Sequence, residues 1–272
     1  MGIRSKRRKV KERLERRTNK YERLKYFEKA PSFKDNQGNL LSSHQLVFPI
    51  LRKVSWDTFV TVGTGFFVHP AGGFVTAKHC LFIGEKYDEN CYAVQTIGQG
   101  QHFIRKIQYF EAHPKADIGV GMLRGELKDG RTGEIVLMAS FPISLKAINL
   151  GDKISTLAYP RMKINDSQVG TFPCDKFTGE VKEYFSNGTA WLKDECYMTN
   201  MLIQSMASGG PALRGTHIIG VNSSSMSLSV NEEPISFITP IDKVFDLVLK
   251  DGEGVTTSVK ELMNSGHMPF AD

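Results

Sequence analysis

The stretch that decides the fold is Met206-Ala207-Ser208-Gly209-Gly210-Pro211, in which a serine stands directly before two glycines and a proline. Glycine reaches positive φ without strain and proline fixes the exit of a turn, so this run can bend the chain sharply and expose one hydroxyl. Taken alone, the run also fits an ordinary turn that is capped by its serine. Other segments of the chain are needed to decide between a nucleophile and a turn cap.

Two segments upstream hold the partners that a nucleophilic serine requires. Residues 72–80 read as a turn and a short apolar strand followed by His79, where a side chain can face a cleft. Residues 113–120 place Asp117 at the start of another apolar strand. Attack by a hydroxyl needs a base and a carboxylate that orients the base. The sequence therefore predicts Ser208 as nucleophile, His79 as base and Asp117 as orienter. Taken singly, they could also be a turn cap, a core histidine and a strand-end cap.

The three segments together resemble a known family. Residues 76–80, 117–120 and 208–211, in this order, resemble the trypsin-like (chymotrypsin-fold) serine peptidases, and the bacterial HtrA-type branch is the most similar. The runs Gly63–Val68 and Phe237–Pro240 add to the resemblance.

The resemblance implies an all-β chain with two antiparallel β-barrels of the chymotrypsin type and a reaction in the cleft between them. The expected activity is endopeptidase hydrolysis of a protein or peptide substrate through an acyl-enzyme on Ser208. No cofactor is implied, and the scattered histidines have no zinc-ligand spacing, so no metal is expected. No PDZ domain is evident after the second barrel.

Short apolar runs separated by turn residues are typical of such barrels. We expect strands at residues 46–50, 58–68, 73–77, 91–97, 103–110 and 118–123 in the first barrel, and at 153–157, 177–185, 190–192, 217–222 and 236–238 in the second. Apolar spacing predicts a helix over 241–250 and a shorter one over 255–263. The predicted domains are 1–40 (basic helical arm and linker), 41–145 (first barrel), 146–240 (second barrel) and 241–272 (C-terminal helical tail).

The positive charge of the chain is concentrated in its first 29 residues, which hold thirteen Lys or Arg and four Glu. Their net charge is +9, whereas the whole chain carries +6, so the remainder carries −3. Apolar residues at positions 10, 14, 21, 24 and 27 have helical spacing. We expect a helical arm that either rests on the body as a solvated helix or binds an anionic partner, such as nucleic acid, an acidic protein or a membrane surface.

Neither a secretory signal nor a membrane span is recognisable in the sequence. Cys80 lacks the disulfide partner usual in the family, because residues 63–65 are Gly-Thr-Gly in that neighbourhood. We therefore expect a cytoplasmic protein with four reduced thiols, and a bridge between Cys174 and Cys196 stays open as an alternative. The sequence leaves the oligomeric state undetermined.

The two residues before Ser208 depart from the family. The resemblance implies an oxyanion hole made of the backbone N–H groups of Met206 and Ser208, but the family usually has glycine at the first of these positions. A side chain restricts the backbone there, so we expect a hole that is misformed at rest and assembles on binding, which would make the protease latent. Ala207 replaces the aspartate that pairs with a new amino terminus after propeptide cleavage, so activation of that kind is not expected.

Substrate recognition is implied at five positions. Leu202 lies at the base of the specificity pocket by family alignment and Ile203 follows it, which predicts an apolar or small residue before the cut bond. Ser223, Ser224 and Ser225 are expected to pair with the substrate backbone, although this region also reads as a polar loop.

Two classes of function fit the sequence. The first is an intracellular trypsin-like serine endopeptidase, latent until it is activated. The second is a catalytically idle peptidase fold that uses its basic arm to bind nucleic acid or an acidic partner.

Overall fold

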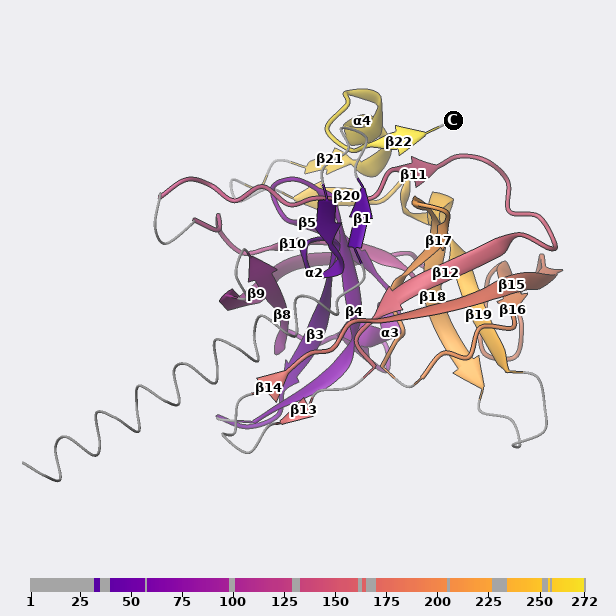
Figure 1. Ribbon diagram of the computed structural model, residues 1–272, viewed down its shortest axis with the longest axis horizontal. Helices are drawn as coiled ribbons and strands as arrows, with labels where there is room; N and C mark the ends of the chain where they lie inside the picture. Colours follow the sequence, from indigo (N-terminus) through magenta and orange to yellow (C-terminus); the bar gives the residue numbers. More distant parts are fainter. Residues whose placement is uncertain are drawn as a thin grey trace, which may run out of the picture.

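The computed structural model describes residues 32–34, 40–56, 58–97, 101–128, 133–160, 163–164, 170–204, 206–226, 234–250, 254 and 256–271. The predicted basic arm lies outside the described residues. The described chain consists mainly of strands, with a few short helices (Figure 1). This confirms the all-β class.

The first barrel is a closed antiparallel sheet with the strand order β10-β5-β4-β3-β8-β9. Its strands are β3 (Val47–Lys53), β4 (Phe59–His69), β5 (Gly73–Thr76), β8 (Cys91–Ile97), β9 (Gln101–Ala112) and β10 (Gly119–Leu123). Buried phenylalanines fill it, with the rings of Phe48 and Phe67 4.7 Å apart between centroids. Closure leaves the sheet of this barrel without a free edge strand. Every strand that the sequence predicts here is present.

The second barrel has the order β17-β12-β15-β16-β19-β18 and closes through the β17–β18 pairing. Its strands are β12 (Lys153–Ala158), β15 (Asp175–Phe185), β16 (Cys196–Thr199), β17 (Pro211–Arg214), β18 (His217–Met226) and β19 (Ile235–Pro240). Two short strands, β11 (Ile143–Ser144) and β22 (Phe270–Ala271), extend this sheet beyond β18 with parallel pairing. The predicted pair of chymotrypsin-type barrels is therefore confirmed.

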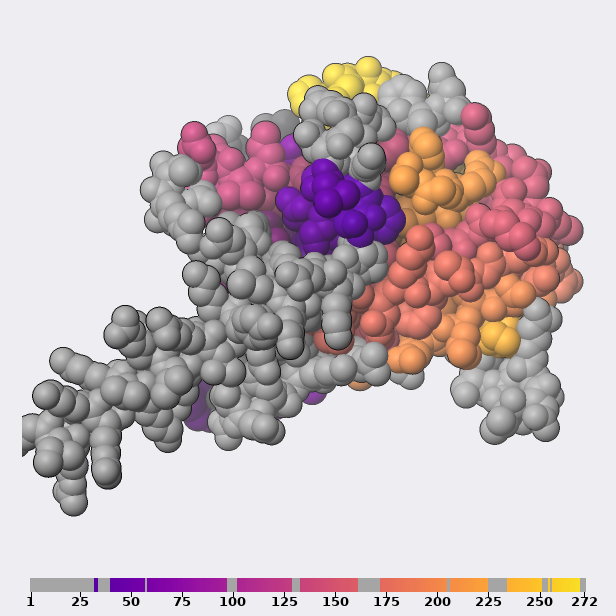
Figure 2. Space-filling model, viewed as in Figure 1, coloured from indigo at the N-terminus to yellow at the C-terminus, as the bar shows by residue number. Residues whose placement is uncertain are grey.

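The segment before the first barrel packs at the junction of the two halves. It comprises β1 (Ser32–Lys34), β2 (Leu40–Ser42) and the short helix α2 (Ser43–Leu46). His44 Nδ1 lies 2.7 Å from the hydroxyl of Tyr159, which follows β12, and both side chains are buried. In the space-filling view this segment is the indigo surface beside the orange residues of the second barrel (Figure 2).

The prediction from sequence is wrong at several places in the second half. Strands β16 and β17 were not expected. Residues 190–192 form a bend and not the predicted strand, because Thr189 Oγ1 accepts the N–H groups of Trp191 at 3.2 Å and Leu192 at 3.1 Å.

The predicted helix over 241–250 is also wrong. Residues Ile241–Val244 form one 3₁₀ turn, η1, and Val248–Lys250 form β20, which pairs with β21 (Thr256–Ser258). The second predicted helix is present but shorter, as α4 (Val259–Asn264), and it begins at a Ser258 cap. The apolar residues of 241–250 repeat with helical spacing, but they belong to a 3₁₀ turn followed by a strand. Their spacing therefore predicted the wrong secondary structure.

Candidate active site

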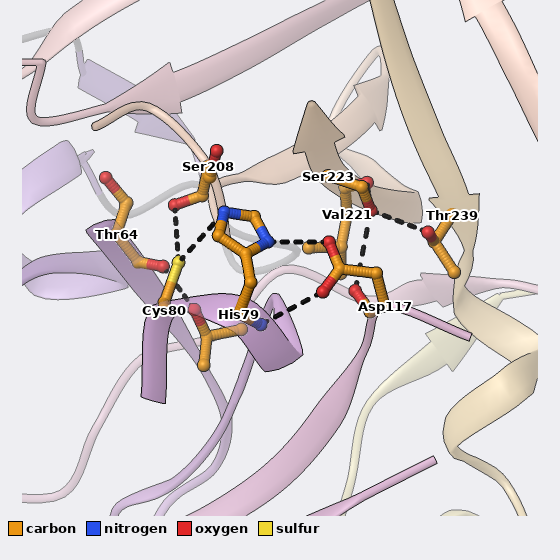
Figure 3. Close-up of polar contacts among 9 residues, drawn as sticks. Thr64, His79, Cys80, Asp117, Ser208, Val221, Ser223 and Thr239 are labelled. Carbon is orange, nitrogen blue, oxygen red and sulfur yellow. Dashed lines mark hydrogen bonds and ion pairs between the residues drawn. The ribbon is translucent and has the colours of Figure 1, made fainter. Parts of the chain in front are cut away.

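His79 and Asp117 lie together at one end of the first barrel. His79 stands on the short helix α3 (Lys78–Leu81) just after β5, and Asp117 stands in the bend before β10. These ends meet because β5 and β10 are antiparallel, with Gly119 opposite Thr76. The Asp117 carboxylate accepts two hydrogen bonds, from ring Nδ1 of His79 at 2.8 Å and from its backbone N–H at 3.0 Å (Figure 3). This contact requires the ring proton on Nδ1 and leaves Nε2 as the basic atom.

The electrostatics of the pair favour a charged imidazole. Desolvation opposes the charge, but the hydrogen bonds and negative charge of Asp117, with Cys80 adding to them, outweigh it and raise the pKa of His79. The His79 side chain is 49% exposed and that of Asp117 only 14%. The carboxylate is thus shielded from water, while the far side of the ring remains open to the cleft.

Ser208 reaches this site from the turn before β17, on the second barrel. Gly209 follows it at φ +86°, and a Cβ there would lie 2.1 Å from Thr76 Oγ1 and 2.2 Å from the Thr64 carbonyl oxygen. A Cβ on Gly210 would lie 2.5 Å from the Leu157 carbonyl oxygen. The two glycines are needed because the backbone of both barrels passes directly against this turn.

The Ser208 hydroxyl makes no hydrogen bond to His79 within the described part of the chain, and Figure 3 draws no contact between them. The neighbour of His79 Nε2 is the Cys80 thiol, with Sγ at 4.0 Å, and the same sulfur lies 3.5 Å from the Ser208 carbonyl oxygen. All four cysteines are buried and free in the structure, as the sequence led us to expect, and Cys174 and Cys196 are not bridged in it. A Cβ on Gly63 would lie 2.3 Å from Cys80 Sγ, so Gly63 leaves the space that the thiol occupies.

Thr64 connects the first barrel to the loop that carries Ser208. Its N–H donates to the Ser208 carbonyl oxygen at 2.8 Å, and its hydroxyl lies 3.5 Å from the Met206 carbonyl oxygen. The hydroxyl also accepts the Tyr159 N–H at 3.0 Å. Thr64 is fully buried, so these partners satisfy its polar atoms.

Met206 adopts a left-handed backbone conformation, with φ of +69°. It is alone in this among the non-glycine residues that the structure describes. Such a conformation costs a side-chain-bearing residue on the order of 1–3 kcal/mol and persists only where the surroundings hold it. Ala207 is fully buried in the core of the second barrel, which anchors the peptide after Met206. The backbone thus takes the region that glycine favours although Met206 carries a side chain.

A cleft of about 870 Å³ runs past these residues. His79, Asp117, Ser208, Ser223 and Ser224 all line it. The sequence-predicted residues of the two barrels are therefore brought together there.

The predicted binding residues do not all have the expected positions. Leu202 and Ile203 do not line this cleft; Leu202 is 69% exposed and Ile203 is buried in the core. Ser223 is buried, with its hydroxyl 2.6 Å from Thr239 Oγ1 and 3.4 Å from the Asp117 carbonyl oxygen, so its side chain supports Asp117. The side chain of Ser225 lies outside the described residues.

The described residues contain no cluster of three or more His, Cys, Asp or Glu side chains able to hold a metal ion. No helix among them is long and apolar enough to cross a membrane.

Two closed antiparallel barrels with a serine, a histidine and an aspartate at their junction define the architecture of the chymotrypsin-type serine peptidases. The family model Trypsin matches residues 45–248, and the chain belongs to this family. A similar solved structure is that of the HtrA-type protease AlgW with a decapeptide, at a TM-score of 0.51 and 15% identity. The match covers 73% of this chain and 62% of AlgW, so the chain spans less than two thirds of that protein. No curated protein matched the chain.

Sequence reasoning missed Thr64 and the environment of Cys80. Thr64 stands between two glycines in a run that the family resemblance uses, which was the only available signal. Thr64 contacts Met206 and Ser208, which lie 142 and 144 positions further along the chain. Contacts between residues so far apart cannot be recognised in a single sequence.

Proposed function

We propose that this protein hydrolyses peptide bonds, with Ser208 as nucleophile, His79 as general base and Asp117 as the residue that holds the imidazole. The observation that carries the proposal is the double contact of the Asp117 carboxylate with His79, in the cleft that Ser208 also lines. Membership of the trypsin family supports the same assignment.

The reaction would proceed in two halves. Nε2 of His79 takes the hydroxyl proton as Ser208 Oγ attacks the carbonyl carbon, and the imidazolium then protonates the leaving amine. A water molecule, deprotonated by the same nitrogen, attacks the acyl-enzyme and releases the acid, and the proton returns to Ser208. The resting structure has no hydrogen bond from Ser208 to His79; such bonds often form fully only with substrate bound.

The N–H groups of Met206 and Ser208 would bind the oxyanion. Neither N–H donates to a protein acceptor within the described residues, which leaves both free for a substrate oxygen. Removal of one such donor typically costs 100- to 1000-fold in rate. If the protease is inactive at rest, the cause would be a movement of the strained Met206 backbone that takes its N–H away from the oxyanion.

We further propose a substrate specificity and a cellular compartment for this protein. The preference for an apolar or small residue before the cut bond rests on the family alignment of Leu202 and Ile203, although neither lines the cleft around Ser208. The backbone of Ser223–Ser225 on β18 would pair with an extended peptide. An intracellular setting is supported by the four free thiols, since disulfides are rare in reducing compartments.

Covalent labelling with a fluorophosphonate tests the proposal. The wild-type chain should be labelled at Ser208, as located by peptide mass mapping, and Ser208→Ala and His79→Ala should abolish labelling. Ser265→Ala removes the hydroxyl of an exposed residue that does not line the cleft, and this variant should label normally. A folded wild-type protein that is not labelled would refute the proposed activity.

The alternative, an idle fold that binds an anionic partner through residues 1–29, draws support from the Ser208 hydroxyl that does not contact His79. It predicts salt-dependent nucleic-acid binding that disappears when residues 1–29 are removed. A chain that is labelled at Ser208 and binds no nucleic acid would exclude it.

A further inference from the structure

Beyond Ser208 and His79, the cleft is bounded by two adjacent loops, one from each barrel. The first loop, residues 113–118, joins β9 to β10, and the second, residues 186–195, joins β15 to β16. His113 Nδ1 accepts the Ala116 N–H at 2.8 Å, which fixes the first loop. Asp194 Oδ2 lies 3.8 Å from the same ring nitrogen, so the two loops meet at this point.

The second loop is held rigidly. Thr189 donates its N–H to the Leu192 carbonyl oxygen at 2.7 Å, and Leu192 is buried in a small apolar cluster. Trp191 packs on Phe237 with 6.3 Å between ring centroids, yet the indole is 59% exposed. A fixed aromatic face therefore borders the cleft.

The charges along this part of the cleft are mostly positive. Lys78, Lys115 and Lys193 line it, against the carboxylates of Glu85 and Asp117. The Asp117 carboxylate is already bound to His79. Lys115 and Lys193 are exposed, and neither has a carboxylate within 4 Å among the described residues.

The two acidic residues of the second loop are held by a lysine outside the cleft. Lys243 Nζ lies 2.6 Å from the Glu195 carboxylate and 3.9 Å from that of Asp194, so both acids are paired with a lysine outside the cleft. His113 adds no positive charge, because desolvation and the nearby lysines lower its pKa against the opposing effect of Asp194 and so favour the neutral ring. The ammonium groups of Lys115 and Lys193 thus remain available to a ligand.

We infer that this part of the cleft is a subsite for an acidic side chain of the substrate, a glutamate or aspartate within a few residues of the cut bond. Lys115 and Lys193 bind its carboxylate, and the exposed Trp191 ring covers its methylene groups. The inference rests on the proposed peptidase function and extends it, because this subsite is separate from Leu202 and Ile203 and selects a different substrate residue.

Peptide sets with Glu, Gln or Lys at each of four positions on either side of the cut bond test the subsite. At one position Glu should exceed Gln roughly three- to tenfold in kcat/KM, as expected for two partly exposed ion pairs, and the preference should shrink as salt is added. The double variant Lys115→Glu with Lys193→Glu should favour Lys over Glu at that position. A control variant, Lys106→Glu with Lys260→Glu, makes the same change in net charge at exposed lysines outside the cleft and should keep the preference for Glu.

Labelling of Ser208 by a neutral fluorophosphonate distinguishes failure of the subsite proposal from failure of the peptidase proposal. Normal labelling with no preference for Glu, or with a preference that survives the charge reversal, would overturn the subsite while the peptidase stands. If the wild-type chain is not labelled, the peptidase proposal fails. Equilibrium binding of the same peptides to the unlabelled protein then tests the subsite. The subsite requires that the Glu peptide bind more tightly than the Gln peptide and that the charge-reversed variant lose this difference.

Discussion

Thr64 on the first barrel donates its backbone N–H to the carbonyl oxygen of Ser208 on the second, at 2.8 Å. Its hydroxyl accepts the Tyr159 N–H, so the hydroxyl proton is left for the Met206 carbonyl oxygen at 3.5 Å. One residue therefore contacts both ends of the Met206–Ser208 tripeptide. Because Ala207 offers no ionic anchor, these contacts across the barrels position the loop that carries the proposed oxyanion donors.

Replacing Thr64 by Val tests this positioning role. The variant removes the hydroxyl and should lower kcat roughly tenfold or more with little change in KM, because the misplaced donors act mainly in the transition state. Thr64→Ser keeps the hydroxyl and should retain most of the rate. Thermal unfolding of both variants reports the structural cost separately. Equal rates for Val and Ser variants would show that the hydroxyl does not position the loop.

Short apolar runs separated by turns, together with three motifs that resemble the trypsin-like peptidases, were enough to predict both barrels and a shared cleft for His79, Asp117 and Ser208. Local pattern failed where a tertiary contact decides the backbone. Val248 donates its N–H to the Glu111 carboxylate at 2.7 Å and belongs to a strand, although its apolar neighbours repeat with helical spacing. Strand β17 begins at Pro211, which the sequence suggested only as the exit of a turn.

The oxyanion loop shows a further limit of sequence reasoning. A methionine at a glycine position predicted an altered loop, yet φ at Met206 is +69°, in the region that glycine favours. The loop is constrained from outside by Thr64 and by the burial of Ala207. Single-residue propensity cannot include such constraints.

Met206→Gly should relieve backbone strain and raise turnover. The left-handed conformation costs a residue with a Cβ on the order of 1 kcal/mol or more, so Tm should also rise by about 2 °C for a chain of this size. Met206→Ala is the matched control, because it keeps the Cβ and removes only the thioether. Steady-state kinetics and thermal unfolding measure the two effects. A glycine variant with unchanged or lower turnover would contradict the proposed latency.

Gly209→Ala should destabilise the fold severely and abolish labelling of Ser208. Its Cβ would lie 2.1 Å from Thr76 Oγ1 and 2.2 Å from a backbone oxygen, at φ +86°. Gly215→Ala is the comparison, since φ there is +65° but no atom lies within 4 Å of the added Cβ. The Gly215 variant should lose only about 1 kcal/mol of unfolding free energy, the cost of strain alone. Denaturant unfolding compares them, and similar losses in both variants would mean that the close approach of the barrels at Gly209 has been overestimated.

The pH dependence of the rate should report the contact of Asp117 with His79. His79 must be neutral to act as a base, and its pKa is raised, so kcat/KM should increase with pH through a midpoint above the ordinary value of about 6.5. Asp117→Asn removes the carboxylate that raises the pKa and leaves the desolvation that lowers it. The midpoint should therefore move to lower pH, and the plateau rate should fall by roughly 10⁴ because the amide does not hold the useful tautomer.

Asp152→Asn is the control for this shift, since Asp152 pairs with Arg214 at 2.7 Å on the second barrel and does not line the cleft. Its midpoint should match that of the wild type. If the midpoint in Asp117→Asn stays above 6.5 while the rate falls, Asp117 orients the ring without setting its charge. In that case the double hydrogen bond acts through geometry alone, and another group, with the neighbouring Cys80 thiol as the first candidate, must raise the pKa of His79.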